Sequence, residues 1–253
     1  MEIIDYIKNK ISIKINENII IDPSNTFGLS NSYKMQNIIN QYISNTKIVY
    51  IFFITDCCDS FVIPNNVRVY RTSLFKSQKK ANEFILPYIW EGFDTFEPLE
   101  IIDKPIVGFC GLSGPYRKKT IQLCQQDNRI VSNFIIRNHF WGGKPHDPEL
   151  INDFLNNIKL SHFNICNRGA GNFSMRFYQV LSCGRIPILL NTDILLPFED
   201  EINWNNIIIF ADTEEEIIEK VINCTNVVER QIKCREIYDT YFSGTKFLDR
   251  ILS

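Results

Sequence analysis

Runs of hydrophobic residues separated by polar segments divide the first part of the chain into short elements. The apolar runs at residues 47–54 and 67–72 have the length and composition of buried strands, and the apolar spacing over 33–44 predicts a helix before them. A polar, proline-containing segment, 55–66, connects the two predicted strands. Loops that follow strands often carry functional residues in α/β folds, so this segment is where we expect chemistry in the N-terminal half.

From residue 106 onward, strand-like and helix-like patterns alternate regularly. The predicted elements, in chain order, are a strand at 106–110, a helix at 116–125, a strand at 130–136, a helix at 148–159, a strand at 162–166, a helix that Gly184 ends, strands at 186–190 and 207–210, and helices at 213–223 and 227–242. This alternation predicts a parallel sheet with helices on both faces. Prolines interrupt the pattern between the two halves, so we place the boundary between a lobe at 1–102 and a lobe at 103–253.

The segment 167–193 joins a glycine-containing loop, a short amphipathic helix and a buried strand. Gly169 allows the loop to turn tightly, and Asn172 or Ser174 is expected to cap the first turn of the helix. Such a helix start presents free N–H groups to an anion. Arg176 would add a guanidinium that binds phosphate oxygens in a bidentate way, although a surface arginine in a salt bridge has the same sequence pattern. The segment therefore predicts a phosphate-binding site.

A second glycine-containing loop, within 107–117, also lies between a predicted strand and a helix. The glycines beside Ser113 would let a phosphate approach closely, and Arg117 would add positive charge in the first turn of the helix. The loop lacks a full dinucleotide-binding fingerprint, and a plain tight turn with a solvated arginine fits the same residues. Arg168 and Arg137 are further cations that could reach the same cleft. For Arg137 and the aromatic residues after it, a packing or surface role is equally open.

Composition sets limits on function. The chain has a formal charge of −2 and no long basic run, so no nucleic-acid partner is predicted. No apolar segment approaches the ~20 residues that cross a bilayer, and the N-terminus has no secretory pattern, so we expect a cytoplasmic protein without a membrane span. The eight cysteines are expected to be reduced, and the three histidines show no metal-ligand spacing, so no metal site is predicted.

A series of residues within and after 167–193 forms a motif. Its members are Ser174, Arg176, Gln179, Gly184, Ile186, Pro187, Asp193, Leu196, Pro197, Phe198 and Trp204. This motif resembles the C-terminal motif of exostosin-family glycosyltransferases, family 47 of the sequence-based classification, in particular the short soluble members found in bacteria and large DNA viruses. The resemblance extends more loosely back to about Pro105. One position departs, because Gln179 stands where the family usually has a glutamate.

The resemblance implies an α/β protein of the GT-B type, with two Rossmann-like lobes whose parallel sheets face a cleft. It implies an inverting glycosyltransferase that moves a sugar from a UDP-sugar donor, held by the C-terminal lobe, to a carbohydrate acceptor, with no cofactor. The family's glutamate is expected to contact the ribose; Gln179 keeps an acceptor oxygen for this contact but lacks the charge. The chain contains no Asp-x-Asp pair, which agrees with transfer that needs no metal ion.

An inverting transfer needs a base that removes the proton of the acceptor hydroxyl. Asp56 and Asp59, both in the segment 55–66, are the candidates, although loop carboxylates are more often solvated surface groups. Two other functions stay open. A protein of the same fold that binds nucleotide or carbohydrate without catalysis would fit the change at Gln179. A Rossmann-type oxidoreductase is disfavoured, because no acidic residue follows a glycine fingerprint at the expected distance.

Overall fold

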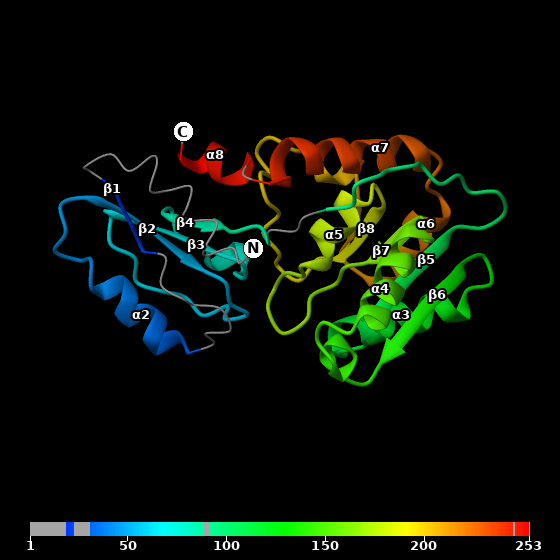
Figure 1. Cartoon of the computed structure of the whole chain (residues 1–253), viewed down its shortest axis with the longest axis horizontal. Helices are drawn as coiled ribbons and strands as arrows, with labels where there is room; N and C mark the ends of the chain where they lie inside the picture. The colour runs from blue at the N-terminus through cyan, green and yellow to red at the C-terminus, as the bar shows by residue number, and fades with distance from the viewer. Residues whose placement is uncertain (1–18, 23–30, 89–91, 245, 253) are drawn as a thin grey trace.

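The computed structural model of this protein describes residues 19–22, 31–88, 92–244 and 246–252. Two parallel β-sheets lie side by side, the first from the N-terminal part of the chain and the second from the rest (Figure 1). The first sheet has the strand order β1 (Ile19–Asp22), β2 (Ile48–Phe53), β3 (Val67–Arg71) and β4 (Glu83–Ile85). The second has the order β6 (Val131–Arg137), β5 (Ile106–Leu112), β7 (Phe163–Ile165), β8 (Ile186–Leu190) and β9 (Ile209–Ala211). The predicted α/β architecture with parallel sheets is confirmed.

Helix α2 (Ser32–Asn40) packs on the first sheet, and the Asn31 side chain caps it by accepting a hydrogen bond from the Lys34 backbone N–H. Buried side chains of the helix and sheet form a small core: Met35, Ile39, Val49, Ile51, Phe53, Cys57, Phe61, Val67 and Val69. The predicted helix and two strands are confirmed with small shifts of their ends. Strand β4 escaped prediction because it has three residues, one of which, Glu83, is charged yet fully buried.

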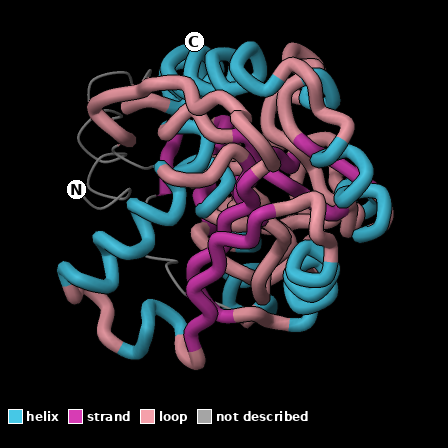
Figure 2. Tube along the Cα trace, turned by 90° about the vertical axis from the view of Figure 1, so that its right-hand side faces the viewer, coloured by secondary structure: helices cyan, strands magenta, loops and turns pink. Residues whose placement is uncertain are grey.

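Five helices accompany the second sheet: α3 (Pro115–Gln126), α4 (Pro148–Lys159), α5 (Arg176–Ser182), α6 (Glu214–Ile222) and α7 (Val227–Ile237). Figure 2 looks onto this half of the molecule and shows helices on both sides of the strands. Helices α3 and α4 each have a proline in the first turn. Backbone N–H groups there have no partner within the helix, so the missing N–H of proline removes no hydrogen bond. The Asp147 and Thr213 side chains cap α4 and α6. The sequence pattern therefore located each of these elements.

The C-terminal end of the chain returns to the first sheet. After α7, a π-helical turn, η4 (Tyr238–Phe242), leads to helix α8 (Lys246–Leu252), which lies over the first sheet (Figure 1). Phe247 and Leu248 of α8 are buried against Phe52 and Tyr70 of the sheet. The second half of the chain thus supplies part of the packing of the first lobe. The predicted boundary at residues 102 and 103 lies in the connection between β4 and β5 and stays a prediction.

Candidate active site

A cavity of about 490 Å³ lies where the two sheets point their carboxyl ends toward each other. Its first wall comes from the loop after β2 and from the connection after β4: Ile54, Thr55, Asp56 and Tyr88. The second wall comes from the ends of β5 and β6, the first half of α4 and the loop before α5. Parallel α/β sheets bind ligands at this end of their strands, so the cavity is the candidate active site.

Two arginines form the cationic part of the second wall. Arg176 donates from Nη2 to the Cys110 carbonyl oxygen at 2.6 Å and from Nη1 to that of Ile165 at 3.2 Å, with its guanidinium 4.4 Å from the centre of the Phe109 ring. Arg117 donates from Nε to the Asn167 carbonyl oxygen at 3.0 Å. These backbone contacts fix both guanidinium groups at the ends of the central strands.

These two arginines have no carboxylate in direct contact among the described residues, although the charge of Asp56 acts on Arg117 from across the cavity. Within the described residues, neither Arg117 nor Arg176 forms an ion pair with a carboxylate. Burial and the neighbouring charge of Arg117 lower the pKa of Arg176 to about 10. Burial likewise lowers the pKa of Arg117 below its usual range. Two close, partly desolvated cations of this kind favour an anion with two negative groups, since it would offset both charges.

Asp56 faces the cavity from the opposite wall, and hydrogen bonds of its neighbours hold it there. The Thr55 backbone N–H donates to the Thr72 hydroxyl at 2.9 Å, and that hydroxyl donates to the Thr55 carbonyl oxygen at 2.8 Å. The Thr55 hydroxyl accepts from the Cys57 backbone N–H at 3.0 Å. The backbone on both sides of Asp56 is therefore fixed, and its carboxylate is exposed to the cavity.

A fully buried ion pair lies beneath the same loop. Arg71 Nε is 2.8 Å from Glu83 Oε1, and neither side chain has exposed surface. Arg71 Nη1 donates to the Asp59 carbonyl oxygen at 2.8 Å. A buried charge pair is retained only where its geometry is well satisfied, and here it anchors the loop that carries Asp56 to strands β3 and β4.

The two lobes meet at Gly171, beside the cavity. A methyl group placed on Gly171 would lie 2.2 Å from Ser73 Oγ and 2.6 Å from Asp56 Oδ1. Only a residue without a side chain allows the loop before α5 to approach the Asp56 loop this closely. Gly171 therefore sets the distance between the candidate base and the cationic wall.

A second contact between the lobes involves Asp193, whose φ of 59° is left-handed. Its carboxylate accepts hydrogen bonds from the backbone N–H and the hydroxyl of Ser77 in the turn η1 (Lys76–Gln78). Lys76 also forms an ion pair with Glu199 at 2.9 Å. These contacts join the turn after β3 to the loop after β8.

The predicted site residues divide into two groups. Those that line the cavity are Asp56, Arg117, Arg137, Gly169, Ser174, Arg176 and Gln179. Those that do not line it are Asp59, Ser113, Arg168 and Asn172. Seven positions from four separate stretches of sequence thus come together at one cavity.

Three of the residues outside the lining, Asp59, Arg168 and Asn172, make contacts elsewhere. The Asp59 carbonyl holds Arg71. Arg168 lies over the Tyr116 ring at 4.4 Å and donates to the Ala170 carbonyl oxygen. The expected capping of α5 by Asn172 or Ser174 is wrong: the N-cap is Met175 and has no side-chain hydrogen bond. The Asn172 amide instead donates to the Leu74 and Asp193 carbonyl oxygens across the lobe contact.

Some lining residues were missed by sequence reasoning, and others were named without a definite role. Tyr88 comes from an irregular, proline-interrupted stretch, and burial raises its pKa to about 12. Phe140, Trp141 and Lys144 belong to the connection between β6 and α4. From the sequence, a packing or surface role is equally open for the aromatic residues after Arg137, and Lys144 carries no signal beyond its place after a predicted strand.

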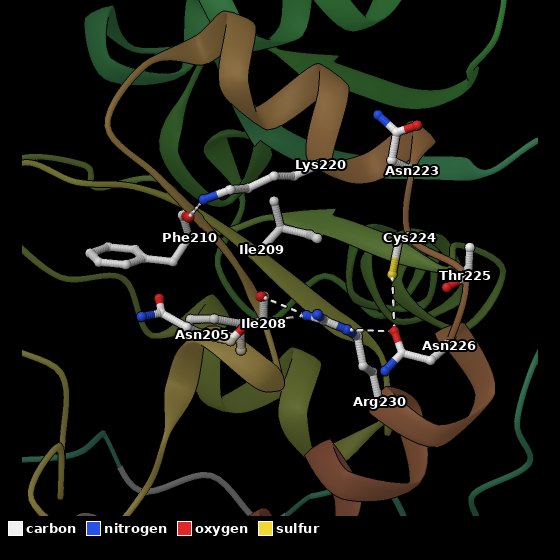
Figure 3. Close-up of a pocket in the computed structure, with 10 residues that line it drawn as sticks. All are labelled: Asn205, Ile208, Ile209, Phe210, Lys220, Asn223, Cys224, Thr225, Asn226 and Arg230. Carbon is white, nitrogen blue, oxygen red and sulfur yellow. Dashed lines mark hydrogen bonds between the residues drawn. The ribbon is translucent and has the colours of Figure 1, made fainter.

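Another cavity, of about 350 Å³, lies beside β9 at the edge of the second sheet (Figure 3). Its two cations are already engaged with the backbone. Arg230 donates to the Ile208 carbonyl oxygen at 3.0 Å, and Lys220 donates to that of Phe210 at 2.6 Å (Figure 3). Such contacts cover the free edge of a sheet, so this cavity is explained by edge protection rather than by substrate binding.

Over the part of the chain that the structure describes, no group of three or more His, Cys, Asp or Glu side chains is placed to hold a metal ion. Among the same residues, no helix has the length and apolar character needed to cross a bilayer.

Sequence comparison identifies relatives of the second lobe. Residues 109–227 match the family model of the exostosin GT47 domain. Exostosin-1 of Drosophila melanogaster is 28% identical over 110 residues, which are 44% of this chain and 12% of that protein. The exostosin-1 homolog of Caenorhabditis elegans is 29% identical over 97 residues, 36% of this chain and 25% of that protein. The match thus spans a quarter or less of these relatives.

Solved structures of similar fold align with almost the whole chain. A mutant of S. aureus TarM, solved with fondaparinux, alpha-GlcNAc-glycerol and UDP, aligns with a TM-score of 0.53 and 13% identity over 98% of this chain and 57% of that one. The GtfA/B complex aligns with a TM-score of 0.53 and 8% identity, over 98% of this chain and 59% of that one. This chain therefore has the GT-B fold of glycosyltransferases, and its residues 109–227 are similar in sequence to the exostosin GT47 domain.

Proposed function

We propose that this protein is an inverting glycosyltransferase that moves a sugar from a UDP-sugar to a carbohydrate acceptor without a metal ion. One observation carries the proposal: two arginines without carboxylate partners among the described residues face an exposed aspartate across one cavity between the lobes. A diphosphate on one wall and an acceptor hydroxyl on the other would complete this arrangement. UDP in the TarM complex, which shares the fold, supports the choice of nucleotide.

In the proposed reaction, the acceptor oxygen attacks the anomeric carbon as the bond from that carbon to the diphosphate oxygen breaks. Asp56 takes the proton of the acceptor hydroxyl, and a single displacement inverts the anomeric centre. Arg117 and Arg176 stabilise the negative charge that develops on the leaving UDP. Their paired positive charges supply what a divalent cation provides in other transferases, so activity is expected to persist in EDTA.

Gln179 is the residue that separates this proposal from its alternative. It is buried, lines the cavity one helical turn after Arg176 and replaces the glutamate usual in the family. Its amide oxygen is still able to accept a hydrogen bond from a ribose hydroxyl, without the strength that a charge adds. The alternative is a protein that binds the nucleotide or carbohydrate at the same cavity but does not catalyse transfer.

Donor binding and turnover distinguish these functions. UDP and a panel of UDP-sugars are added in a thermal-shift assay, because a ligand that binds only the native state raises the apparent stability. Hydrolysis or transfer of the stabilising UDP-sugar is then followed with and without EDTA. Turnover supports the transferase, whereas stabilisation without turnover supports the binding protein. A shift with NAD and none with UDP would reject both.

The first testable prediction concerns Arg176. Arg176→Ala is expected to weaken UDP binding about 10-fold to 100-fold, because hydrogen bonds to a charged group contribute roughly 1.5–3 kcal/mol. Arg176→Lys keeps the charge but loses the planar fork, so an intermediate affinity is expected. Titration calorimetry measures the affinities, and circular dichroism checks the fold. The control is Arg129→Ala, which removes a surface ion pair with Asp127. An affinity unchanged in Arg176→Ala would remove this residue from the site.

A further inference from the structure

Beside its cationic half, the cavity has a mainly apolar half, and Lys144 and His146 of the connection between β6 and α4 also line the cavity. Leu150, Ile151 and Phe154 line it from α4, and Phe140 and Trp141 line it from the turn η2 (Phe140–Gly143). Phe154 connects the two halves, since its ring centre is 5.6 Å from the Arg176 guanidinium. An apolar surface thus continues directly from the proposed diphosphate position.

The rings of Phe140 and Trp141 are exposed, with 64% and 63% of their surface accessible. Large aromatic residues of this lobe are otherwise mainly in its core, as Trp204 is with 3%. At the mouth of a cavity, two exposed aromatic rings keep apolar surface in contact with water, which is unfavourable and is not offset by packing within the chain. Their open faces are therefore available to a flat ligand.

The turn η2 holds these rings in a defined place. Trp141 has a left-handed φ of 55°, and Gly142 and Gly143 follow with 65° and 81°. A methyl group on Gly142 would lie 2.7 Å from Leu150 Cδ1, so the turn is pressed against α4. Arg137 Nη2 donates to the Leu150 carbonyl oxygen at 2.9 Å and connects the end of β6 to the same helix.

We propose that Trp141, with Phe140, stacks on the uracil base of the donor and so forms the nucleobase subsite of the cavity. This assignment rests on the proposed function. It names the part of the donor that the apolar half of the cavity recognises. A nucleoside diphosphate combines a flat, uncharged ring with two phosphates. The cavity offers a matching partner for each part: aromatic faces for the ring and guanidinium groups for the phosphates.

An acceptor sugar fits the apolar half less well than a base does. A pyranose carries several hydroxyl groups that each require a hydrogen-bond partner when buried. The side chains of Leu150, Ile151 and Phe154 have no polar atoms to meet them. A base presents an uncharged π-face, and stacking of a base on an aromatic side chain is worth about 1–3 kcal/mol by alanine substitution.

Calorimetry with two probes, UDP and inorganic pyrophosphate, tests the proposal on the full chain. Trp141→Ala is expected to weaken UDP binding about 5-fold to 150-fold and to leave pyrophosphate binding unchanged. Trp141→Phe retains a ring and is expected to recover most of the UDP affinity. Tyr33→Ala is the matched control, because Tyr33 is an exposed aromatic residue of α2 in the other lobe.

Fluorescence supplies a second measurement that does not depend on the alanine variant. Trp141 is exposed and Trp204 is buried, so UDP is expected to quench the part of the emission that disappears in Trp141→Phe. Pyrophosphate is expected to leave that emission unchanged. Equal quenching by pyrophosphate would overturn the stacking assignment.

The outcomes separate this inference from the proposed function. If the natural chain binds UDP and Trp141→Ala binds it equally well, the nucleobase subsite is wrong while the function stands. If Trp141→Ala raises only the KM for the acceptor, the rings belong to the acceptor and the inference is again wrong. If the natural chain binds pyrophosphate but not UDP, both the donor and its nucleobase subsite are rejected.

Discussion

At the residue scale, the cavity gives different roles to side chains that look alike in sequence. Asp56 and Asp59 are separated by two residues, yet only Asp56 lines the cavity. Arg117 and Arg168 both lie close to glycines at the end of a strand, yet Arg168 is stacked on Tyr116 instead of facing the cavity. Each difference follows from which backbone group or ring holds the residue, a property of the folded chain.

The two aspartates give a direct prediction. Asp56→Asn is expected to reduce the transfer rate by about 10²-fold to 10⁴-fold, the usual contribution of a general base, while UDP affinity stays nearly constant. Asp59→Asn is the matched control and is expected to keep most of the activity, because Asp59 contacts Arg71 through its backbone carbonyl. Steady-state kinetics measures both. If only Asp59→Asn reduced the transfer rate, Asp59 and not Asp56 would be the base.

Gly171 gives a second prediction at this scale. Gly171→Ala would force a methyl group into the space of Ser73 Oγ, so the lobes must shift apart at a cost of about 1–3 kcal/mol. The unfolding temperature and the transfer rate are both expected to fall. Gly114→Ala is the control, because a methyl group there meets no atom within 4 Å. Equal unfolding temperatures in the two variants would show that the lobes do not depend on this contact.

At the element scale, the helices and strands with a clear hydrophobic period were predictable, and those that depend on distant partners were not. Strand β4 exists because Arg71 of β3 neutralises its Glu83. Helix α8 crosses to the first sheet because Phe247 and Leu248 find an apolar surface there. Neither partner lies close in sequence, so no local pattern marks the element.

The return of α8 leads to a prediction about stability. Phe247→Ala removes a ring whose centre lies 5.9 Å from that of Phe198 and 6.5 Å from that of Tyr70, which it meets edge-on. The free energy of unfolding is therefore expected to fall by about 3 kcal/mol. Urea unfolding followed by circular dichroism measures the change. Tyr33→Ala, at an exposed ring of α2, is expected to change stability much less. A similar small effect in Phe247→Ala would mean that α8 adds little to the first lobe.

At the scale of the whole molecule, the cavity exists only because the loops of two sheets meet. The Asp193 carboxylate, which joins the turn η1, and Gly171, which touches the Asp56 loop, set the width of the cavity. An antiparallel bridge between Phe75 and Ile194 runs beside them. These contacts place the cationic wall and the candidate base on opposite sides of one space.

Ser77 allows the lobe contact to be tested without changing the cavity lining. Ser77→Ala removes the hydroxyl that donates to the Asp193 carboxylate, a charged acceptor whose hydrogen bonds are worth roughly 1.5–3 kcal/mol when well protected. Because Ser77 is exposed, the free energy of unfolding is expected to fall by roughly 1.5 kcal/mol or less. The KM for the acceptor is expected to rise. Small-angle scattering compares the lobe separation, and Ser60→Ala, at another exposed serine, is the control. Identical scattering and kinetics would rule out a role for this contact in lobe spacing.

Local sequence patterns were enough to predict the order of most elements, the parallel α/β architecture and the segment that carries Arg176 and Gln179. These patterns were enough because strand and helix periodicities and glycine turns are local properties of the chain. The folded chain was needed to show that Asp56 rather than Asp59 lines the cavity, that Asn172 joins the lobes instead of capping α5, and that Trp141 is exposed at the cavity. These outcomes depend on contacts between residues far apart in sequence, whose geometry is set by how the two sheets pack.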